Sequence, residues 1–174
     1  MQRCAWVTKD EIYIAYHDTE WGKPISGDDA MFERMSLEGF QAGLSWLTIL
    51  KRREGFRRAF SGFKIDEVAK FTERDVERLL EDTGIIRHRG KIEAVIHNAR
   101  LAKDLDAGLE SFVRQFTPSA DRRGLTTSPE SLELSKALRR QGFKFVGPTT
   151  MHALMQAIGM VNDHDENCLF GKQV

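Results

Sequence analysis

Residues 128–150, SPESLELSKALRRQGFKFVGPTT, carry the signals of a helix that ends in a very short turn. Ser128 followed by Pro129 is a favourable N-cap and first helical position, and glycine is the residue found most often just beyond a helix C-terminus. Gly142 lies just beyond the expected C-terminus of this helix. The pattern therefore predicts a helix over residues 129–140 and a turn directly after it.

A second helix is expected to begin at Pro148 and to end at Gly159. The connection between the two helices is only a few residues long and includes Lys144 and Gly147. Free backbone N–H groups at the start of a helix, with a lysine nearby, make a potential phosphate site. A plain helix–helix connection would use the same glycines, so the turn alone leaves both interpretations open.

Helical signals recur along the rest of the chain, and no strand pattern persists. Ser26 with Asp29, and Thr72 with Asp75, each fit a capping box before a helix; the first helix is expected to run to about residue 42. A further helix is expected over residues 44–60, with Trp46, Ile49, Leu50 and Phe56 inward. The helix after Thr72 has an apolar stripe of Val76, Leu79 and Leu80. Another helix is expected over 88–104, with Ile92, Val95, Ile96 and Ala99 inward. The expected fold class is all-α, in a single domain covering residues 1–174.

Composition sets the broad class of protein. The chain has 174 residues, of which 41% are apolar and 30% charged, as in an ordinary globular domain. The opening segment has no apolar core of a signal peptide, and no run approaches the roughly 18 apolar residues of a membrane span. Two cysteines do not make a secreted disulfide framework. We therefore expect a cytoplasmic protein with reduced thiols and no membrane partner.

The formal net charge is zero, so any nucleic-acid surface must come from local clusters of basic residues. Three segments are locally basic, namely 51–58 (KRREGFRR), 87–91 (RHRGK) and 136–144 (KALRRQGFK). Each could be a solvated helix face, and together they suggest a folded basic face.

The N-terminal stretch 4–22, CAWVTKDEIYIAYHDTEWG, is unusually rich in metal-ligand and aromatic side chains. Cys4 and His17 lie near the N-terminus, and His164 and Cys168 lie near the C-terminus, with a spacing that puts both on one face if that segment is helical. Two thiolates and two imidazoles suit a closed, structural zinc site. From spacing alone, two buried free cysteines and two unrelated histidines remain the alternative.

Glu38 is the residue that fits its predicted helix least well. It falls three residues after Met35 on the apolar stripe, where a carboxylate needs a partner or its pKa rises. The alternative is an exposed glutamate on a helix with misplaced ends.

Together these segments resemble the 3-methyladenine-DNA glycosylase I family of the helix-hairpin-helix glycosylase superfamily. The matching stretches are RCAWV, YIAYHDTEWG, LEGFQAGLSW, GIIRHRGKI, LSKALRRQGFKFVGPTT and MVNDH with the trailing Cys168. They occur in the family's order from Arg3 to Cys168, and YHDTEWG with LEGFQAGLSW is the most specific part.

The resemblance implies a monomeric enzyme that flips 3-methyladenine out of double-stranded DNA and excises it. It implies one structural zinc ion, held by Cys4, His17, His164 and Cys168. It implies a base pocket in which Glu38 is the catalytic residue and the binding residues are Trp46, Tyr16, Trp6, Tyr13 and Trp21. The DNA contacts implied are an inserted Leu44 with its neighbour Gly43, and a phosphate held near Lys144, Gly147 and Thr149.

One departure from the superfamily bears on the chemistry. Many members carry an assisting aspartate after the helix that follows the hairpin, whereas alignment here places Asn162, rather than Asp163, at that position. No lysine stands in an obvious nucleophile position, and a cationic base is already a good leaving group. We therefore expect simple hydrolysis without a lyase step.

Two other functions explain part of the pattern. A zinc nucleobase deaminase needs a CxxC ligand pair, and this chain has none. A non-enzymatic helix-hairpin-helix DNA-binding module explains the hairpin and the basic clusters, but it leaves Glu38 and the aromatic N-terminus without a purpose.

Overall fold

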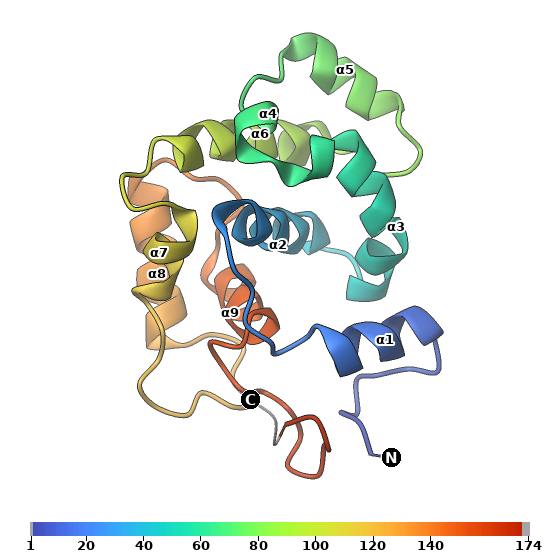
Figure 1. Cartoon of the computed structure of the whole chain (residues 1–174), viewed down its shortest axis with the longest axis vertical. Helices are drawn as coiled ribbons and strands as arrows, with labels where there is room; N and C mark the ends of the chain where they lie inside the picture. Colours follow the sequence, from blue (N-terminus) through green and yellow to red (C-terminus); the bar gives the residue numbers. More distant parts are fainter. Residues whose placement is uncertain (1, 172–174) are drawn as a thin grey trace.

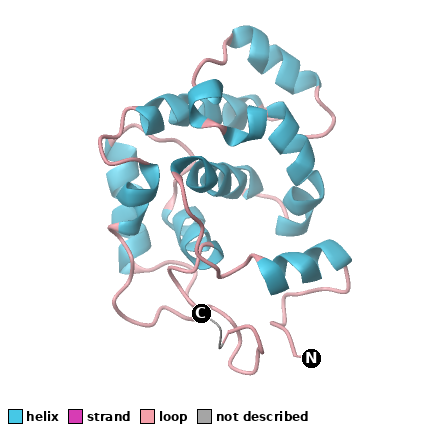
Figure 2. Ribbon diagram, viewed as in Figure 1, coloured by secondary structure: helices cyan, strands magenta, loops and turns pink. Residues whose placement is uncertain are grey.

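The computed structural model of this chain describes residues 2–171, and within them the chain is all-helical (Figure 2). The elements are α1 (Glu11–Thr19), α2 (Asp28–Gln41), α3 (Trp46–Ala59), the short 3-10 turn η1 (Ser61–Phe63), α4 (Ile65–Val68), α5 (Glu73–Glu81), α6 (Arg89–Lys103), α7 (Leu109–Arg114), α8 (Pro129–Arg140) and α9 (Pro148–Ala157). No helix in this range is long and apolar enough to cross a membrane. The expected fold class is confirmed.

Helix α2 lies at the centre of the molecule (Figure 1). It packs against α3, α6, α7 and α9, and most of its residues are buried. Met31, Phe32 and Leu37 are fully buried. Because the helix is buried on several sides, its apolar and polar residues do not separate into two clear faces. A functional side chain on α2 is therefore held by rigid packing on several sides.

Several predicted helix ends are confirmed. Thr72 and Asp75 form the capping box of α5, and Ser128 caps α8 by accepting a hydrogen bond from the N–H of Ser131. Gly142 has φ +94°, the left-handed conformation expected beyond a helix C-terminus. The predicted apolar stripe of α6 is buried.

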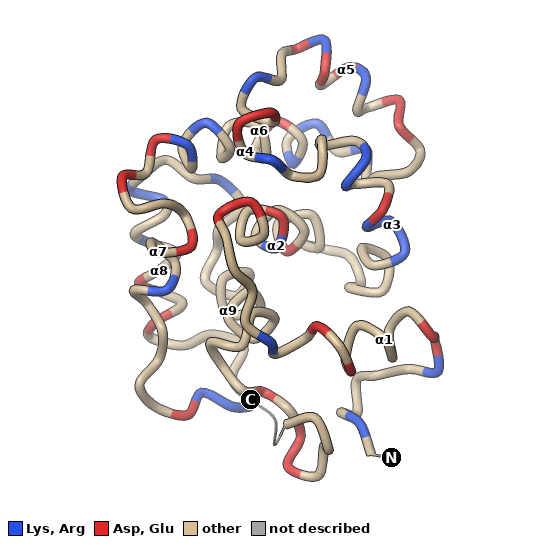
Figure 3. Tube along the Cα trace, in the orientation of Figure 1, with Lys and Arg blue, Asp and Glu red and all other residues tan. Residues whose placement is uncertain are grey.

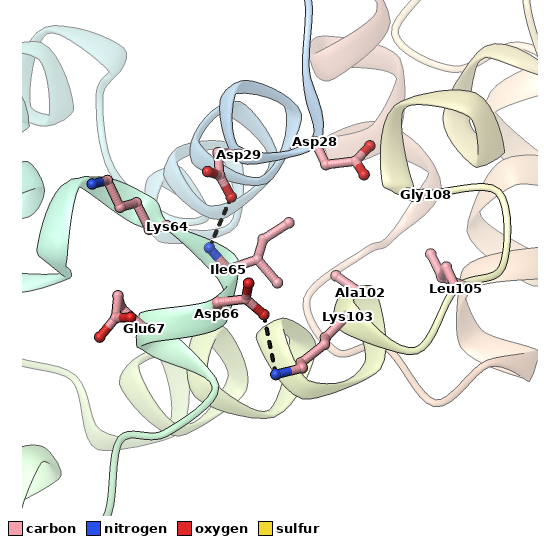
Figure 4. A pocket seen from close by; sticks show the side chains of 10 residues that line it. All are labelled: Asp28, Asp29, Lys64, Ile65, Asp66, Glu67, Ala102, Lys103, Leu105 and Gly108. Carbon is pink, nitrogen blue, oxygen red and sulfur yellow. Dashed lines mark hydrogen bonds and ion pairs between the residues drawn. The ribbon is translucent and has the colours of Figure 1, made fainter.

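The capping box predicted at Ser26 and Asp29 is wrong. Helix α2 begins at Asp28 with Gly27 at the N-cap, and no side chain caps it. The aspartates bind other elements instead: Asp29 accepts a hydrogen bond from the N–H of Ile65 at 2.9 Å (Figure 4), and Asp28 accepts one from the N–H of Glu110 at 2.8 Å. These carboxylates therefore bind the backbone of other helices instead of capping the N-terminus of α2.

The third helix starts two residues later than predicted, because Ser45 is its N-cap and accepts a hydrogen bond from the N–H of Thr48. Leu44 therefore lies in the preceding turn. Helices α1, α4 and α7 were not predicted. Helix α1 was missed because it presents apolar and aromatic side chains on more than one side, and α4 and α7 are too short to show a helical period.

The N-terminal and C-terminal segments lie side by side at one end of the molecule (Figure 1). The N–H of Ala5 donates to the carboxylate of Asp165 at 2.7 Å, and the N–H of Leu169 donates to the carbonyl of Gln2 at 3.2 Å. Helix α1, which follows the first segment, packs against α3. The chain ends thus become one side of the region where α1, α2, α3 and α9 meet.

Candidate active site

A pocket of about 150 Å³ lies where α1, the C-terminal half of α2, the start of α3 and α9 meet. The residues that line it are Trp6, Tyr13, Tyr16, Trp21, Glu38, Gln41, Trp46, Ala153 and Gln156. Every side chain that the sequence assigned to a base pocket is in this set. They come from segments as far apart in the chain as Trp6 and Trp46, so the fold alone brings them together.

Aromatic rings form most of the pocket wall. The ring centre of Trp6 lies 5.0 Å from that of Tyr13 and 4.9 Å from that of Trp21, and the rings of Tyr16 and Trp46 are 5.5 Å apart. These tilted and edge-on arrangements are the favoured ones for aromatic pairs. Burial raises the pKa of the Tyr16 phenol, so this residue presents a neutral hydroxyl. The wall is therefore a rigid, largely uncharged surface with flat faces.

Glu38 is the acidic group in this wall. It is only 5% exposed, so the alternative of a surface glutamate is wrong. Burial raises the pKa of Glu38 to about 8, and the positive charge of Arg34, one helical turn earlier on α2, opposes the rise only in part. No hydrogen bond from the described residues contributes to its pKa. Glu38 is thus a desolvated carboxyl group facing a pocket with no partner of its own.

Arg34 is held behind the pocket rather than inside it. Its guanidinium donates to Glu20 at 2.8 Å and lies 5.7 Å from the centre of the Tyr16 ring. Arg53 of α3 also donates to Glu20, at 2.7 and 2.8 Å. The network ties α2, α3 and the end of α1 together beneath the aromatic wall.

Next to the pocket, four buried side chains form a group that could hold a metal ion, with all potential ligand atoms within 4.8 Å of one another. The Sγ atom of Cys4 lies 3.4 Å from Nδ1 of His164; the Sγ atom of Cys168 lies 3.4 Å from the same nitrogen and 3.5 Å from Nε2 of His17. Residues 164–168 are not helical, and the fold still brings Sγ of Cys168 and Nδ1 of His164 into the same group of potential ligand atoms. The predicted ligand set is assembled.

The surroundings of the four side chains suit metal binding. The other ring nitrogen of His17, Nδ1, lies 2.8 Å from Oδ1 of Asp18. A carboxylate in this position fixes the orientation of a metal-binding imidazole and leaves Nε2 free to bind the ion. Burial lowers the pKa of His164, which keeps its imidazole neutral. Burial raises the pKa of the Cys4 thiol to about 12, so a thiolate there requires a cation beside it. The ring of Trp21 lies 4.6 Å from that of His164, which joins this group to the pocket wall.

Two exposed turns carry the side chains predicted to contact DNA. Gly43, with φ +81°, and Leu44, which is 39% exposed, lie between α2 and α3. Lys144 is exposed in the short connection between α8 and α9, and Thr149 is exposed in the first turn of α9. Gly147 is the N-cap of α9, and no side chain among the described residues caps this helix by a hydrogen bond. The structure thus leaves both turns open for contact.

Lysines and arginines occur on most helices (Figure 3), and the three basic clusters differ in how many of their charges are paired. In residues 51–58, Arg53 and Arg57 are paired with glutamates. In residues 87–91, Arg89 is paired with Glu73, Glu77 and Glu93, and Lys91 is buried. Arg139, Arg140 and Lys144, from the third cluster, are exposed and take part in no ion pair among the described residues.

A larger hollow, of about 390 Å³, lies among α2, α4, α6 and α7 (Figure 4). Its walls carry several carboxylates, but these have structural partners: Asp29 accepts from Ile65, and Asp66 pairs with Lys103 at 3.1 Å. An acidic hollow of this kind would repel a phosphate backbone. The aromatic pocket is therefore the better candidate site.

Three pocket residues were not identified from the sequence, namely Gln41, Ala153 and Gln156. Gln41 lies within the quoted stretch LEGFQAGLSW, and its position at the end of α2 was the available signal. Ala153 and Gln156 lie on α9, whose pocket-facing side has no sequence feature to distinguish it. Nε2 of Gln156 donates to Asp163 at 2.8 Å.

Comparison with known proteins places this arrangement in a family. The family model described as Methyladenine glycosylase matches residues 6–172. The chain is 48% identical to the DNA-3-methyladenine glycosylase 1 of Escherichia coli (strain K12), over 97% of this chain and 96% of that protein. It is 42% identical to the DNA-3-methyladenine glycosylase of Haemophilus influenzae (strain ATCC 51907 / DSM 11121 / KW20 / Rd), over 95% and 96% of the two chains.

Solved structures agree with the sequence relatives. A structure showing how 3-methyladenine is recognised by 3-methyladenine DNA glycosylase I from Staphylococcus aureus superposes with a TM-score of 0.92 at 34% identity, covering 98% of this chain and 97% of that one. A family match over nearly the whole chain, with relatives of this identity and coverage, shows that the chain belongs to the methyladenine glycosylase family.

Proposed function

We propose that this chain is a DNA repair glycosylase that flips 3-methyladenine out of alkylated double-stranded DNA and hydrolyses its glycosidic bond. The observation that carries the proposal is the buried carboxyl group of Glu38, which has no hydrogen-bond partner among the described residues, in a pocket walled by aromatic rings. The names of the curated relatives and the 3-methyladenine recognition described for the S. aureus glycosylase support it.

The pocket chemistry suits a flipped cationic base. A nucleotide must leave the duplex before its glycosidic bond is accessible, and aromatic faces recover stacking worth on the order of 1–3 kcal/mol per base. A 3-methylated adenine in DNA is positively charged, so the faces of Trp46 and Tyr16 add cation–π attraction. Burial in the pocket raises the pKa of Glu38 to about 8. A bound cation would lower that pKa and favour the ionised carboxylate, which would pair with the positive charge; neutral adenine offers no such charge.

The bond-breaking step needs little more from the protein. Water attacks the sugar carbon as the bond to the base nitrogen breaks, and the electron pair of that bond neutralises the departing cation. The added water then loses one proton to solvent, which leaves a hydroxyl group on the sugar. The described pocket lining contains no lysine that could form a covalent bond to the sugar. Asp163 accepts hydrogen bonds from Gly124 and Gln156, and Asn162 donates to the carbonyl of Gly171, so neither is a free assisting group in the pocket. These contacts support hydrolysis without a lyase step.

The exposed turn between α2 and α3 and the exposed turn between α8 and α9 would both contact the DNA. The exposed Leu44 would insert into the gap that the flipped nucleotide leaves, and Gly43, with its positive φ, allows the tight turn that carries Leu44. The uncapped N–H groups after Gly147, with Lys144 and Thr149 beside them, would bind a backbone phosphate in the manner of a helix-hairpin-helix motif.

We also infer that the Cys4, His17, His164 and Cys168 group binds one structural zinc ion. With zinc–sulfur and zinc–nitrogen bonds of about 2.3 and 2.0–2.1 Å, a tetrahedral site has sulfur–nitrogen edges of about 3.5 Å, and the observed edges of 3.4 and 3.5 Å fit. Four protein ligands leave no open position for water, so the ion would hold the two chain ends together and keep the aromatic wall in place.

The experiment that tests the proposed function incubates the protein with duplex DNA treated with dimethyl sulfate and follows two products. A glycosylase without lyase activity releases free 3-methyladenine and leaves an unbroken abasic strand. A DNA-binding module that is not an enzyme binds the duplex and releases no base.

A further inference from the structure

The basic segment RHRGK has an unexpected place in the fold, because its Lys91 is buried beneath a turn. Lys91 is 8% exposed, and its ammonium group donates to the carbonyls of Phe40 at 2.9 Å and Ala42 at 2.6 Å. The last carbonyls of a helix lack partners within the helix, so Lys91 completes the C-terminal end of α2. Gly43 follows Ala42 directly, so the turn that carries Leu44 starts from a clamped residue.

A second polar clamp lies farther along the same helix, α6. The side-chain amide of Asn98 donates to the carbonyl of Lys144 at 2.9 Å, and the N–H of Lys144 donates back to Oδ1 of Asn98 at 2.9 Å. Nε2 of the neighbouring His97 lies 2.9 Å from the carbonyl of Gly142. The backbone of the turn between α8 and α9 is therefore attached to α6.

Lys91 and Asn98, which make these two sets of hydrogen bonds, lie on the same face of α6. Seven residues separate Lys91 from Asn98, which is close to two helical turns and about 10.5 Å along the axis. Helix α2 also contacts the turn between α8 and α9 directly, because a Cβ atom at Gly39 of α2 would lie 3.5 Å from Cβ of Phe145. Phe145 itself has φ +57°, an unusual conformation for a bulky residue that the surrounding contacts must maintain.

We propose that α6 is a positioning element for DNA, in which Lys91 and Asn98 fix the spacing between the insertion turn, residues 42–45, and the phosphate turn, residues 142–147. The inference rests on the proposed function, since it assigns both turns to DNA contact. Neither side chain lines the aromatic pocket. Lys91 and Asn98 act through the backbones they hold, so that a phosphate bound at one turn places the flipped nucleotide at the other.

The test compares Lys91→Met, which keeps the length of the side chain without its charge, with Lys103→Met. Lys103 is an exposed residue near the far end of α6. Two affinities are measured: that for free 3-methyladenine, by tryptophan fluorescence, and that for a duplex carrying a tetrahydrofuran abasic analogue. Because small errors in the placement of a bound group have large effects, we expect Lys91→Met to weaken duplex binding by about tenfold or more. Affinity for the free base should stay the same, and Lys103→Met should change neither.

A purely structural role for Lys91 gives a different pattern. Equal loss of both affinities would mean that the substitution disturbs the whole domain, and an unchanged duplex affinity would mean that the spacing does not matter; either result overturns the proposal. If Lys91→Met does not fold, Asn98→Ala tests the other clamp with the same two measurements and the same expectations. Wild-type protein that bound the duplex but released no 3-methyladenine would refute the proposed function, while the comparison of duplex affinities would still decide the role of α6.

Discussion

Replacing Glu38 by glutamine keeps the size of the side chain and removes its charge, and it should therefore change how stability depends on pH. In the folded protein burial raises the pKa of Glu38 from 4.5 to about 8. A raised carboxyl pKa means that the folded state holds a proton that the unfolded chain has already lost. This contribution to stability is complete below about pH 4.5 and is lost as the pH rises through about 8.

The size of the effect follows from the two pKa values. The full contribution is about 5 kcal/mol, because each pKa unit corresponds to about 1.4 kcal/mol. Between about pH 5.5 and pH 8 the wild type should lose about 3 kcal/mol of stability relative to Glu38→Gln. A buried amide without a partner has its own cost, but that cost does not vary with pH and cancels from the trend.

The assay is urea unfolding of both proteins across this pH range, with Glu81→Gln as the control. Glu81 is exposed at the end of α5, and its replacement should leave the pH trend of the wild type unchanged. A difference between wild type and Glu38→Gln that stays constant with pH would refute the reasoning, because it would mean that Glu38 is ionised in the folded protein at no cost.

The same variant tests recognition of the base. Above about pH 8, where Glu38 is ionised, its hydrogen bond to the base is charge-assisted. Losing such a bond costs roughly 1.5–3 kcal/mol, so free 3-methyladenine should bind about tenfold to a hundredfold more weakly to Glu38→Gln at that pH. Excision should suffer less than in an enzyme that depends on a catalytic aspartate, because the cationic base already leaves readily. Equal affinities, measured by tryptophan fluorescence, would remove Glu38 from the base site.

Three further predictions concern the metal and the DNA. Cys168→Ala should release zinc and lower the melting temperature before it affects chemistry; retention of one zinc per chain would show that the ligand set is wrong. Reversing the charges of Arg139, Arg140 and Lys144 should weaken binding to all duplex sequences about equally and reduce the salt dependence of binding, and an unchanged affinity at low salt would place the DNA on another face. Leu44→Ala should slow 3-methyladenine release from duplex DNA without weakening binding of the free base, and normal release would exclude insertion by Leu44.

Much of the fold follows from local signals in the sequence. The Thr72 and Ser128 caps, the glycine at 142 and the apolar stripe of α6 act within one helix or at its end, so a single sequence contains them. The signal at Ser26 failed because Asp29 binds the backbone of Ile65, thirty-six residues away. Only the folded chain contains that competing partner.

Some features of the candidate site are visible in the sequence, and others depend on tertiary packing. Residue type marked Glu38 and the ligand pairs as unusual, since a carboxylate on an apolar stripe and soft ligands at both chain ends need an explanation. The meeting of Cys4 with His164, and of α9 with the pocket, depends on tertiary packing and was available only through the family resemblance or the structure. The role of Lys91 was concealed for the same reason, because a lysine in a basic run gives no sign that it is buried.

Excision of 3-methyladenine by the wild-type protein is tested by identifying, by mass and under single-turnover conditions, every base that it releases from one preparation of methylated duplex DNA. We predict that 3-methyladenine is released while unmodified adenine stays at the level found without protein, because neutral adenine offers Glu38 no positive charge. Release of adenine at a comparable rate, or tight duplex binding with no base released, would contradict it.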